Sequence, residues 1–227
     1  MTPESTVFLV DDDMEVRQSL TRLLASVNLP CQAFGNAREF LDAYDPARPG
    51  CLVLDVRMPG MSGIELQKHL VSKDIAIPVI IITGHGDIPM AVDALHRGAV
   101  SFLEKPVRPQ HLLDEIQQAL AQDVRRRELE KGREAVASHL ALLTAREREV
   151  LDGVVAGKST KAIASALNLS PKTIDFHRAK IMERMKADSV ASLVRMVLAG
   201  QGAEERPSPR HDMESLSQGP PENTAPQ

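Results

Sequence analysis

Carboxylates follow two apolar runs near the start of this 227-residue chain, and their positions are typical of a cation site. The run "VFLV" leads directly into Asp11, Asp12 and Asp13, and the run "CLVL" leads into Asp55. If both runs are strands of one parallel sheet, their carboxyl ends meet at the edge where such sheets bind ligands. Crowded carboxylates repel one another unless a cation lies between them, and oxygen ligands of this kind suit Mg²⁺. The sequence therefore predicts a magnesium site.

Two further side chains stand at the ends of later apolar runs and favour phosphoryl transfer. Thr83 follows "VIII" and Lys105 follows "SFLE", whereas no run ends in a histidine or in a serine or cysteine beside a base. Mg²⁺ and Lys105 would neutralise the oxygens of an aspartyl phosphate, and Thr83 would donate a hydrogen bond to one of them. Asp55 is therefore the expected phosphoacceptor.

Two alternatives stay open for the first carboxylates. For Asp13, the N-cap of a helix that begins near Met14 is the favoured explanation. A Mg²⁺-dependent phosphohydrolase could instead use Asp11 as its nucleophile and Asp13 as its acid and base, because "DDD" contains the required D-x-D spacing. Such a hydrolase needs a further acidic pair after its lysine, whereas Lys105 is followed by Pro106 and a helix. We therefore expect a protein that is not an enzyme.

The elements that position these residues form one α/β pattern over the first 120 residues. Five near-continuous apolar runs predict strands: "TVFLV", "CQAF", "CLVLD", "PVIIIT" and "SFLEK". Amphipathic stretches between them predict helices at 15–27, 36–43, 63–72, 88–97 and 109–121. Strands that are apolar throughout belong to a parallel sheet covered on both faces, which predicts a doubly wound α/β domain. Cys31 and Cys51 lie in apolar contexts without metal-ligand spacing, so we expect core residues there.

The second half of the chain differs in charge and in pattern. Residues 1–122 carry 16 acidic and 10 basic side chains, whereas 138–200 carry 6 and 10. No strand-like run follows residue 140; four short helices are expected at 144–156, 159–167, 171–185 and 189–199, with caps at Thr144, Gly157 and Ser170. These patterns predict a domain at 1–122, a helical linker or coiled-coil stalk at 123–139, an all-α domain at 140–200, and a disordered tail at 201–227.

The stretch "SPKTIDFHRAKIMERMK" predicts a helix with a buried and a polar face. Ile174, Ile181 and Met185 fall on one face, with His177 at its border. Phe176 falls among charges on the other face, where it is either a partly covered surface residue or a contact to a thymine methyl group. Basic and polar residues of this helix and the preceding one are expected to contact DNA: Lys158, Ser159, Lys161, Lys172, Thr173, Asp175, Phe176, Arg178, Ala179 and Lys180.

The strings "LVDDD", "LDVRMPGMSG", "IIITGHGDIPMAV" and "GAVSFLEKP" resemble the receiver domain of two-component response regulators, over residues 5–121. The resemblance implies a flavodoxin-like strand order 2-1-3-4-5 and phosphorylation of Asp55. It implies a Mg²⁺ ion held by Asp12, Asp55 and the backbone carbonyl of Arg57, with Asp11 close by. Thr83, Phe102 and Lys105 match the switch positions of that family, and a cis peptide bond is expected before Pro106.

The stretch "LTAREREVLDGVVAGKSTKAIASALNLSPKTIDFHRAKIMERMKA" resembles the helix-turn-helix domain of the LuxR and NarL type, and the whole chain resembles the FixJ-type transcription regulators. That family implies a sensor histidine kinase, a homodimer formed on phosphorylation near helix 88–97 and the fifth strand, and sequence-specific promoter binding, with RNA polymerase as a further partner and activation as the expected outcome. A protein-binding role for the second domain stays open. The chain shows no membrane segment or signal peptide, so we expect a cytoplasmic protein.

Overall fold

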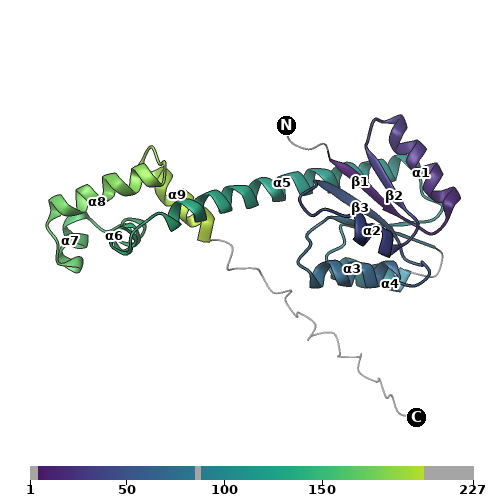
Figure 1. Cartoon of the computed structure of the whole chain (residues 1–227), viewed down its shortest axis with the longest axis horizontal. Coiled ribbons are helices and arrows are strands. Elements are labelled where there is room, and N and C mark those ends of the chain that lie inside the picture. The colour runs from purple at the N-terminus through teal and green to yellow at the C-terminus, as the bar shows by residue number, and fades with distance from the viewer. Residues whose placement is uncertain (1–4, 85–87, 202–227) are drawn as a thin grey trace, which may run out of the picture. The chain divides into compact units, whose positions relative to one another are not determined.

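The computed structural model describes residues 5–84 and 88–201, with the backbone but not the side chains of residues 88–91. The chain divides into two compact units, Met1–Lys131 and Gly132–Gln227, and each is described by itself (Figure 1). The tail expected beyond residue 201 lies outside the described residues. None of the helices within the described ranges is both long and apolar enough to cross a membrane.

The first unit is built around five parallel strands. The strands are β1 Thr6–Val10, β2 Cys31–Phe34, β3 Gly50–Asp55, β4 Val79–Thr83 and β5 Ser101–Glu104. They are ordered β2-β1-β3-β4-β5, and every neighbouring pair is parallel. The predicted doubly wound sheet and its strand order are confirmed.

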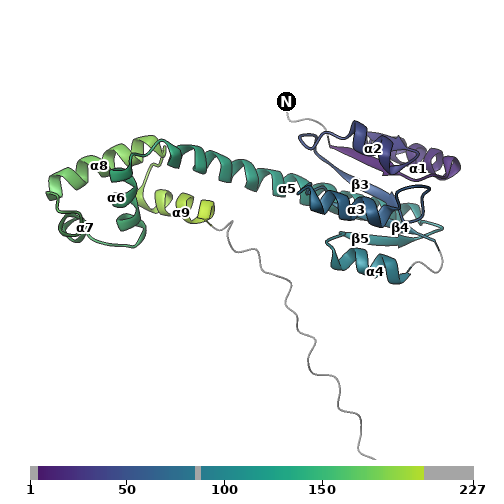
Figure 2. The ribbon, with the colours of Figure 1, turned by 60° about the horizontal axis from the view of Figure 1, so that its bottom comes forward.

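Helices cover both faces of this sheet (Figures 1 and 2). They are α1 Met14–Ser26, α2 Ala37–Ala43, α3 Gly63–Ser72, α4 Ile88–His96 and α5 Pro109–Ala141. Alternate residues of each strand face opposite layers. Phe8 and Leu54 pack with α2, α3 and α4, whereas Leu9 and Val53 pack with α1 and α5.

Two sequence features of the first unit have a clear structural outcome. Cys51 is fully buried and Cys31 is half-buried against the same core, and neither forms a disulfide. Burial, together with the Asp123 charge, raises the pKa of the Cys51 thiol to about 12, which makes it an inert core group. Helix α5 continues without a break through Gly132, well beyond the apolar stretch that predicted it.

The second unit is all helical. It contains the last turns of α5 with α6 Ala145–Val155, α7 Thr160–Leu167, α8 Pro171–Arg184 and α9 Val190–Gln201. The predicted capping box at Thr144 is present, Ser170 caps α8 before Pro171, and Gly157 follows α6 with a φ of +70°. Ile174, Ile181 and Met185 are buried in one core with residues of α6, α7 and α9, as the helical pattern predicted.

Candidate functional site

Three carboxylates meet at the carboxyl edge of the central strands. Val10 of β1 pairs with Leu54 of β3, so the residues that come next, Asp11 and Asp55, leave the sheet side by side. Asp11, Asp12 and Asp55 each offer a carboxylate oxygen, and these oxygens lie within 4.8 Å of one another. Asp11 and Asp55 are buried, whereas Asp12 is exposed to solvent. The cluster is thus closed on the sheet side and open toward solvent.

Lys105 is the cation that faces this cluster. It follows β5, precedes a cis bond to Pro106 as expected, and places Nζ 2.8 Å from Asp11 Oδ2 and 2.7 Å from Asp55 Oδ1. Burial alone would lower the pKa of Lys105, but the hydrogen bonds to the two carboxylates outweigh it, so the pKa is raised. Lys105 therefore carries a fixed positive charge at neutral pH.

Asp55 is held in an electrostatically costly position. Burial raises its pKa; the hydrogen bond from Lys105 and the backbone N–H of Arg57 act against this, and the Asp11 charge adds to it. The net pKa is above the usual range. Gly63 begins α3 directly against the Asp55 carbonyl, where any side chain would collide with the backbone. A further positive charge near Asp55 would therefore stabilise the ionised form of its carboxyl group.

Asp13 takes the capping role that was one of its two expected uses. Its carboxylate accepts hydrogen bonds from the Glu15 and Val16 N–H groups at 2.8 and 3.3 Å, and so caps α1. The Asp13 N–H in turn donates to Asp11 Oδ1 at 2.9 Å. Arg17, which the sequence reading did not select, donates to the Asp11 carbonyl at 2.7 Å. The sequence does place Arg17 one turn after the cap residue Asp13, where its side chain can reach back to the start of the helix.

Thr83 and Phe102 occupy neighbouring strands, β4 and β5. The Thr83 side chain is fully buried, and its hydroxyl donates to the Gly84 carbonyl at 3.3 Å. Phe102 is half-buried and packs against the core layer that contains Ala94 of α4. The sequence also predicts that the loop "GHGDIPMAV" at 84–92 is drawn toward the phosphoryl group together with Thr83; residues 85–87 of this loop lie outside the described residues.

The donor set suits a hard divalent cation. It offers carboxylate oxygens from three side chains against one ammonium, so a cation would reduce the excess of negative charge. Mg²⁺ prefers oxygen ligands and tolerates retained waters, which the exposed position of Asp12 permits. Receiver-type acidic pockets of this composition generally bind Mg²⁺.

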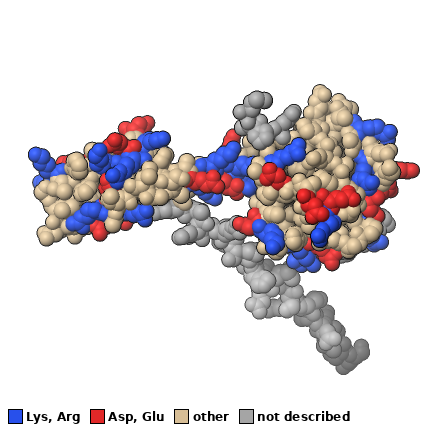
Figure 3. All heavy atoms as spheres, in the orientation of Figure 1, with Lys and Arg blue, Asp and Glu red and all other residues tan. Residues whose placement is uncertain are grey.

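A second candidate surface lies on α7 and α8. Beyond Pro171, the exposed residues of α8 are spaced as one stripe: Lys172, Asp175, Phe176, Ala179 and Glu183. Phe176 is 62% exposed, which confirms that it points away from the core, and its ring meets His177 edge to face. Figure 3 shows basic and acidic side chains intermixed on the visible face of this unit, without a large area of one sign.

Several predicted DNA contacts already have intramolecular partners. Arg178 donates to the Thr160 hydroxyl at 3.0 Å and thereby ties α8 to α7, and Lys180 pairs with Glu183 at 2.9 Å. Ser159 caps α7, and Thr173 shares a hydrogen bond with Ser170 at the start of α8. Lys158, Lys161 and Lys172 are exposed.

A partly buried ion pair that the sequence did not reveal joins α6 to α8. Glu147 accepts hydrogen bonds from the Thr144 N–H and hydroxyl at 2.8 and 2.9 Å and also pairs with Arg184 at the end of α8. Burial alone would raise the pKa of Glu147, but the Thr144 hydrogen bonds and the Arg184 charge lower it overall. Only the capping box was visible in the sequence.

Both halves of the chain match known domain families. Residues 7–117 match the response regulator receiver domain, and residues 141–197 match the bacterial regulatory proteins of the luxR family. Together with the parallel sheet, the carboxylate cluster and the helical second unit, these matches define a two-component response regulator with a LuxR-type DNA-binding domain.

Relatives extend this likeness over nearly the whole chain. The transcriptional regulatory protein FixJ of Bradyrhizobium diazoefficiens is 41% identical over 198 residues, which are 87% of this chain and 97% of that protein. FixJ of Rhizobium meliloti is 44% identical over 86% of this chain and 96% of its own length. The solved structure of the response regulator StyR has a TM-score of 0.79 at 44% identity and covers 86% of this chain and 98% of that one. This chain belongs to the FixJ-type family of response regulators.

Membership settles the general function. The protein regulates transcription under the control of phosphorylation, with DNA and a cognate kinase as its partners. It is a DNA-binding regulator and not a typical enzyme, and the luxR-family match favours a DNA-binding over a purely protein-binding second domain.

Proposed function

We propose that Asp55 is the residue that accepts the phosphoryl group from a sensor histidine kinase. The observation that carries this proposal is the position of Asp55: a buried carboxylate with a raised pKa, 2.7 Å from Lys105 and beside Asp11 and Asp12. In the transfer, an Asp55 oxygen attacks phosphorus, an O–P bond forms, and the P–N bond to the kinase histidine breaks with its electron pair left on that nitrogen.

The surrounding residues have distinct roles in this step. Asp11, Asp12, Asp55 and the backbone carbonyl of Arg57 would hold Mg²⁺, which when bound neutralises charge on the transferring group. Lys105, which contacts Asp55 directly, stabilises the phosphoryl oxygens. Thr83 turns its hydroxyl from the Gly84 carbonyl to a phosphoryl oxygen, because a charged acceptor forms the stronger hydrogen bond.

The structural response proceeds from Thr83 to the edge of the sheet. When Thr83 is drawn toward the phosphoryl group, Phe102 rotates inward from its half-buried position on β5. Phe102 packs on the same core layer as α4, so this rotation reshapes the surface made by α4 and β5. Two phosphorylated chains then dimerise through this surface. Figure 2 shows α4 beside β5 at the edge of the sheet.

The second unit carries the DNA contacts. Lys158, Ser159 and Lys161 at the start of α7 lie near phosphates, and α8 enters the major groove. Ten residues form the proposed contact set: Lys158, Ser159, Lys161, Lys172, Thr173, Asp175, Phe176, Arg178, Ala179 and Lys180. Phe176 contacts a thymine methyl group, and Asp175 accepts a hydrogen bond from a cytosine amine. The bound dimer recruits RNA polymerase and activates transcription.

A gel-shift assay on DNA fragments selected from a random pool tests the proposal. The wild-type chain should bind more tightly after treatment with a small-molecule phosphodonor and Mg²⁺, whereas Asp55→Asn should show no gain. Asp42→Asn, an exposed carboxylate on α2 paired with Arg38, is the matched control and should respond like the wild type. An Asp55→Asn chain that still gains affinity would rule out Asp55 as the phosphoacceptor.

A further inference from the structure

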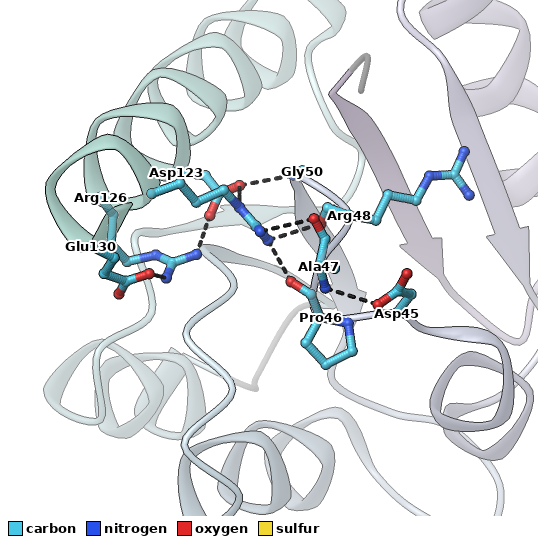
Figure 4. A network of polar contacts seen from close by, with 9 residues as sticks. Asp45, Pro46, Ala47, Arg48, Gly50, Asp123, Arg126 and Glu130 are labelled. Atoms are coloured by element: carbon cyan, nitrogen blue, oxygen red, sulfur yellow. Dashed lines mark hydrogen bonds and ion pairs between the residues drawn. The ribbon is translucent and has the colours of Figure 1, made fainter. Parts of the chain in front are cut away.

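A second buried carboxylate lies at the opposite end of β3 from Asp55. Asp123 belongs to α5 and is fully buried. Its Oδ2 accepts hydrogen bonds from the backbone N–H of Gly50, the first residue of β3, at 3.0 Å and from Arg127 Nε at 2.7 Å; its Oδ1 accepts one from Arg126 at 2.5 Å. Figure 4 shows Asp123 on the helix turned toward Gly50, with the Arg126 side chain between Asp123 and Glu130.

Arg127 connects the same helix to the segment that precedes β3. Its two terminal nitrogens donate to the carbonyl oxygens of Pro46 and Arg48, both at 2.9 Å, and of Ala47, at 3.1 Å. A lysine could not make this set of contacts, because only the guanidinium presents several donors in a rigid plane. Asp123 and Arg127 together therefore join α5, β3 and the α2–β3 connection.

The charges of this network are balanced. Asp123 faces two guanidiniums, and Arg126 pairs a second time with Glu130 at 2.7 Å. Removing one member of such a buried set leaves the others uncompensated, which is costly. The negative charge of Asp123 also affects Cys51: burial raises the pKa of the Cys51 thiol, and the Asp123 charge raises it further. The network is therefore a tight contact and not a surface ion pair.

Helix α5 changes character directly beyond this network. Among the described residues, Glu130 is the last in α5 to form an ion pair; the first compact unit ends at Lys131, and Gly132 follows. A Cβ placed on Gly132 would meet nothing within 4 Å, so packing does not require a glycine there. Glycine in an exposed helix interior weakens the helix relative to alanine, because it gains more backbone freedom on opening.

We propose that the Asp123 network is a clamp that holds α5 on the receiver as far as Lys131, so that the helix opens first at Gly132. Asp123 and Arg127 are then positioning residues: they fix the direction in which α5 leaves the receiver. The expected linker, 123–139, accordingly has a clamped part before Gly132 and a part after it that can open.

Hydrogen–deuterium exchange of the full chain tests the clamp directly. In the wild type, amides at 124–131 should exchange slowly and those just after Gly132 faster. Asp123→Asn should accelerate exchange at 124–131 by about 100-fold or more, because it leaves two buried guanidiniums without their partner. Asp114→Asn changes an exposed α5 carboxylate that accepts a hydrogen bond from Gln110; it is the matched control and should leave exchange at 124–131 unchanged.

Two further variants keep the test decisive if Asp123→Asn destabilises the whole receiver. Arg127→Lys retains the charge but loses the fork of carbonyl contacts, and it should accelerate exchange at 124–131 while the central strands stay protected. Gly132→Ala should slow exchange just after residue 132 by up to about fivefold. Unchanged exchange at 124–131 in Arg127→Lys, or first opening upstream of Asp123 in the wild type, would overturn the proposal. The readout does not depend on phosphorylation or DNA binding.

Discussion

Strand β3 begins at Gly50 and ends at Asp55, and a buried carboxylate receives hydrogen bonds at each of these ends. At the Asp55 end, three carboxylates lie together, and the Lys105 ammonium contacts two of them, Asp11 and Asp55. At the Gly50 end, one carboxylate, Asp123, is shared by two guanidiniums. Both ends are buried and hydrogen-bonded, so burial alone does not tell them apart.

The balance of charge separates the two ends. Burial raises the pKa of Asp55, and the nearby Asp11 charge adds to this, so the cluster gains stability from a bound cation or a transferred group. At the Asp123 end, the two carboxylates of Asp123 and Glu130 balance the two guanidiniums of Arg126 and Arg127, so another ion would add no stability. A buried cluster with unbalanced charge thus indicates a site of binding or reaction, whereas a buried cluster with balanced charge holds elements of the fold together.

The largest effect is expected when the balanced cluster is broken. Asp123→Asn leaves Arg126 and Arg127 partly desolvated without their shared carboxylate, so the receiver should lose about 3–5 kcal/mol of stability. Scanning calorimetry of the full chain, without Mg²⁺, measures the shift of the receiver transition.

Asp114→Asn on the same helix is the control for this variant and should shift the receiver transition by less than about 0.5 kcal/mol. If the two variants shifted the transition equally, the Asp123 cluster would be no more of an anchor than a surface group, and the contrast between the two ends of β3 would be lost.

A smaller loss is expected when the unbalanced cluster loses the ammonium of Lys105. Lys105→Met removes the ammonium that contacts Asp11 and Asp55, which should cost about 2 kcal/mol in the absence of Mg²⁺. Saturating Mg²⁺ should recover more stability in this variant than in the wild type, because the cation then replaces a missing charge. Thermal unfolding with and without MgCl₂ measures both the loss of stability and its recovery by Mg²⁺. Equal stabilisation of both chains by Mg²⁺ would contradict the assignment of the cation to this cluster.

The sequence predicted one of these ends and not the other, for a topological reason. Parallel strands present their carboxyl ends at one edge, so Asp11, Asp55, Thr83 and Lys105 could be grouped from their positions after apolar runs. Asp123 offered no such signal: in sequence it sits among charges of both signs, typical of a solvated helix, and its partner Gly50 lies 73 residues away.

In the second unit, too, the sequence predicted the faces of single helices but not the contacts between helices. Helical spacing predicted that Ile174 and Ile181 would be buried and Phe176 exposed, because periodicity alone determines the face of a helix. It could not show that Arg178 is used to hold α7 or that Arg184 pairs with Glu147, since these contacts depend on how separate helices pack.

A gain of stability is expected when the charge of Asp55 is removed. Because its pKa is raised in the folded chain, the folded state binds this proton more tightly than the unfolded state does. The resulting stability is complete at pH values below the usual range of an aspartate and is lost as the pH rises through the raised pKa. At neutral pH without Mg²⁺, Asp55→Asn should therefore be more stable than the wild type by about 1 kcal/mol.

The advantage of Asp55→Asn should shrink as the pH falls, because the wild-type carboxylate then takes up its proton. Denaturant unfolding of both chains at a series of pH values measures the difference. A constant advantage at all pH values would show that shape, and not charge, distinguishes the variant.

The smallest effect tests whether the clamp depends on its buried members or on the number of its charges. Glu130 pairs with Arg126 but has a 47% exposed side chain, unlike the buried Asp123. An exposed pair one helical turn apart contributes only about 0.3–0.5 kcal/mol, so Glu130→Gln should lower the stability of the receiver by no more than that. Added salt should reduce the difference further, because it screens exposed charges. A Glu130→Gln loss as large as that of Asp123→Asn, and insensitive to salt, would mean that the total charge of the network holds α5, and that the buried carboxylate has no special part in the clamp.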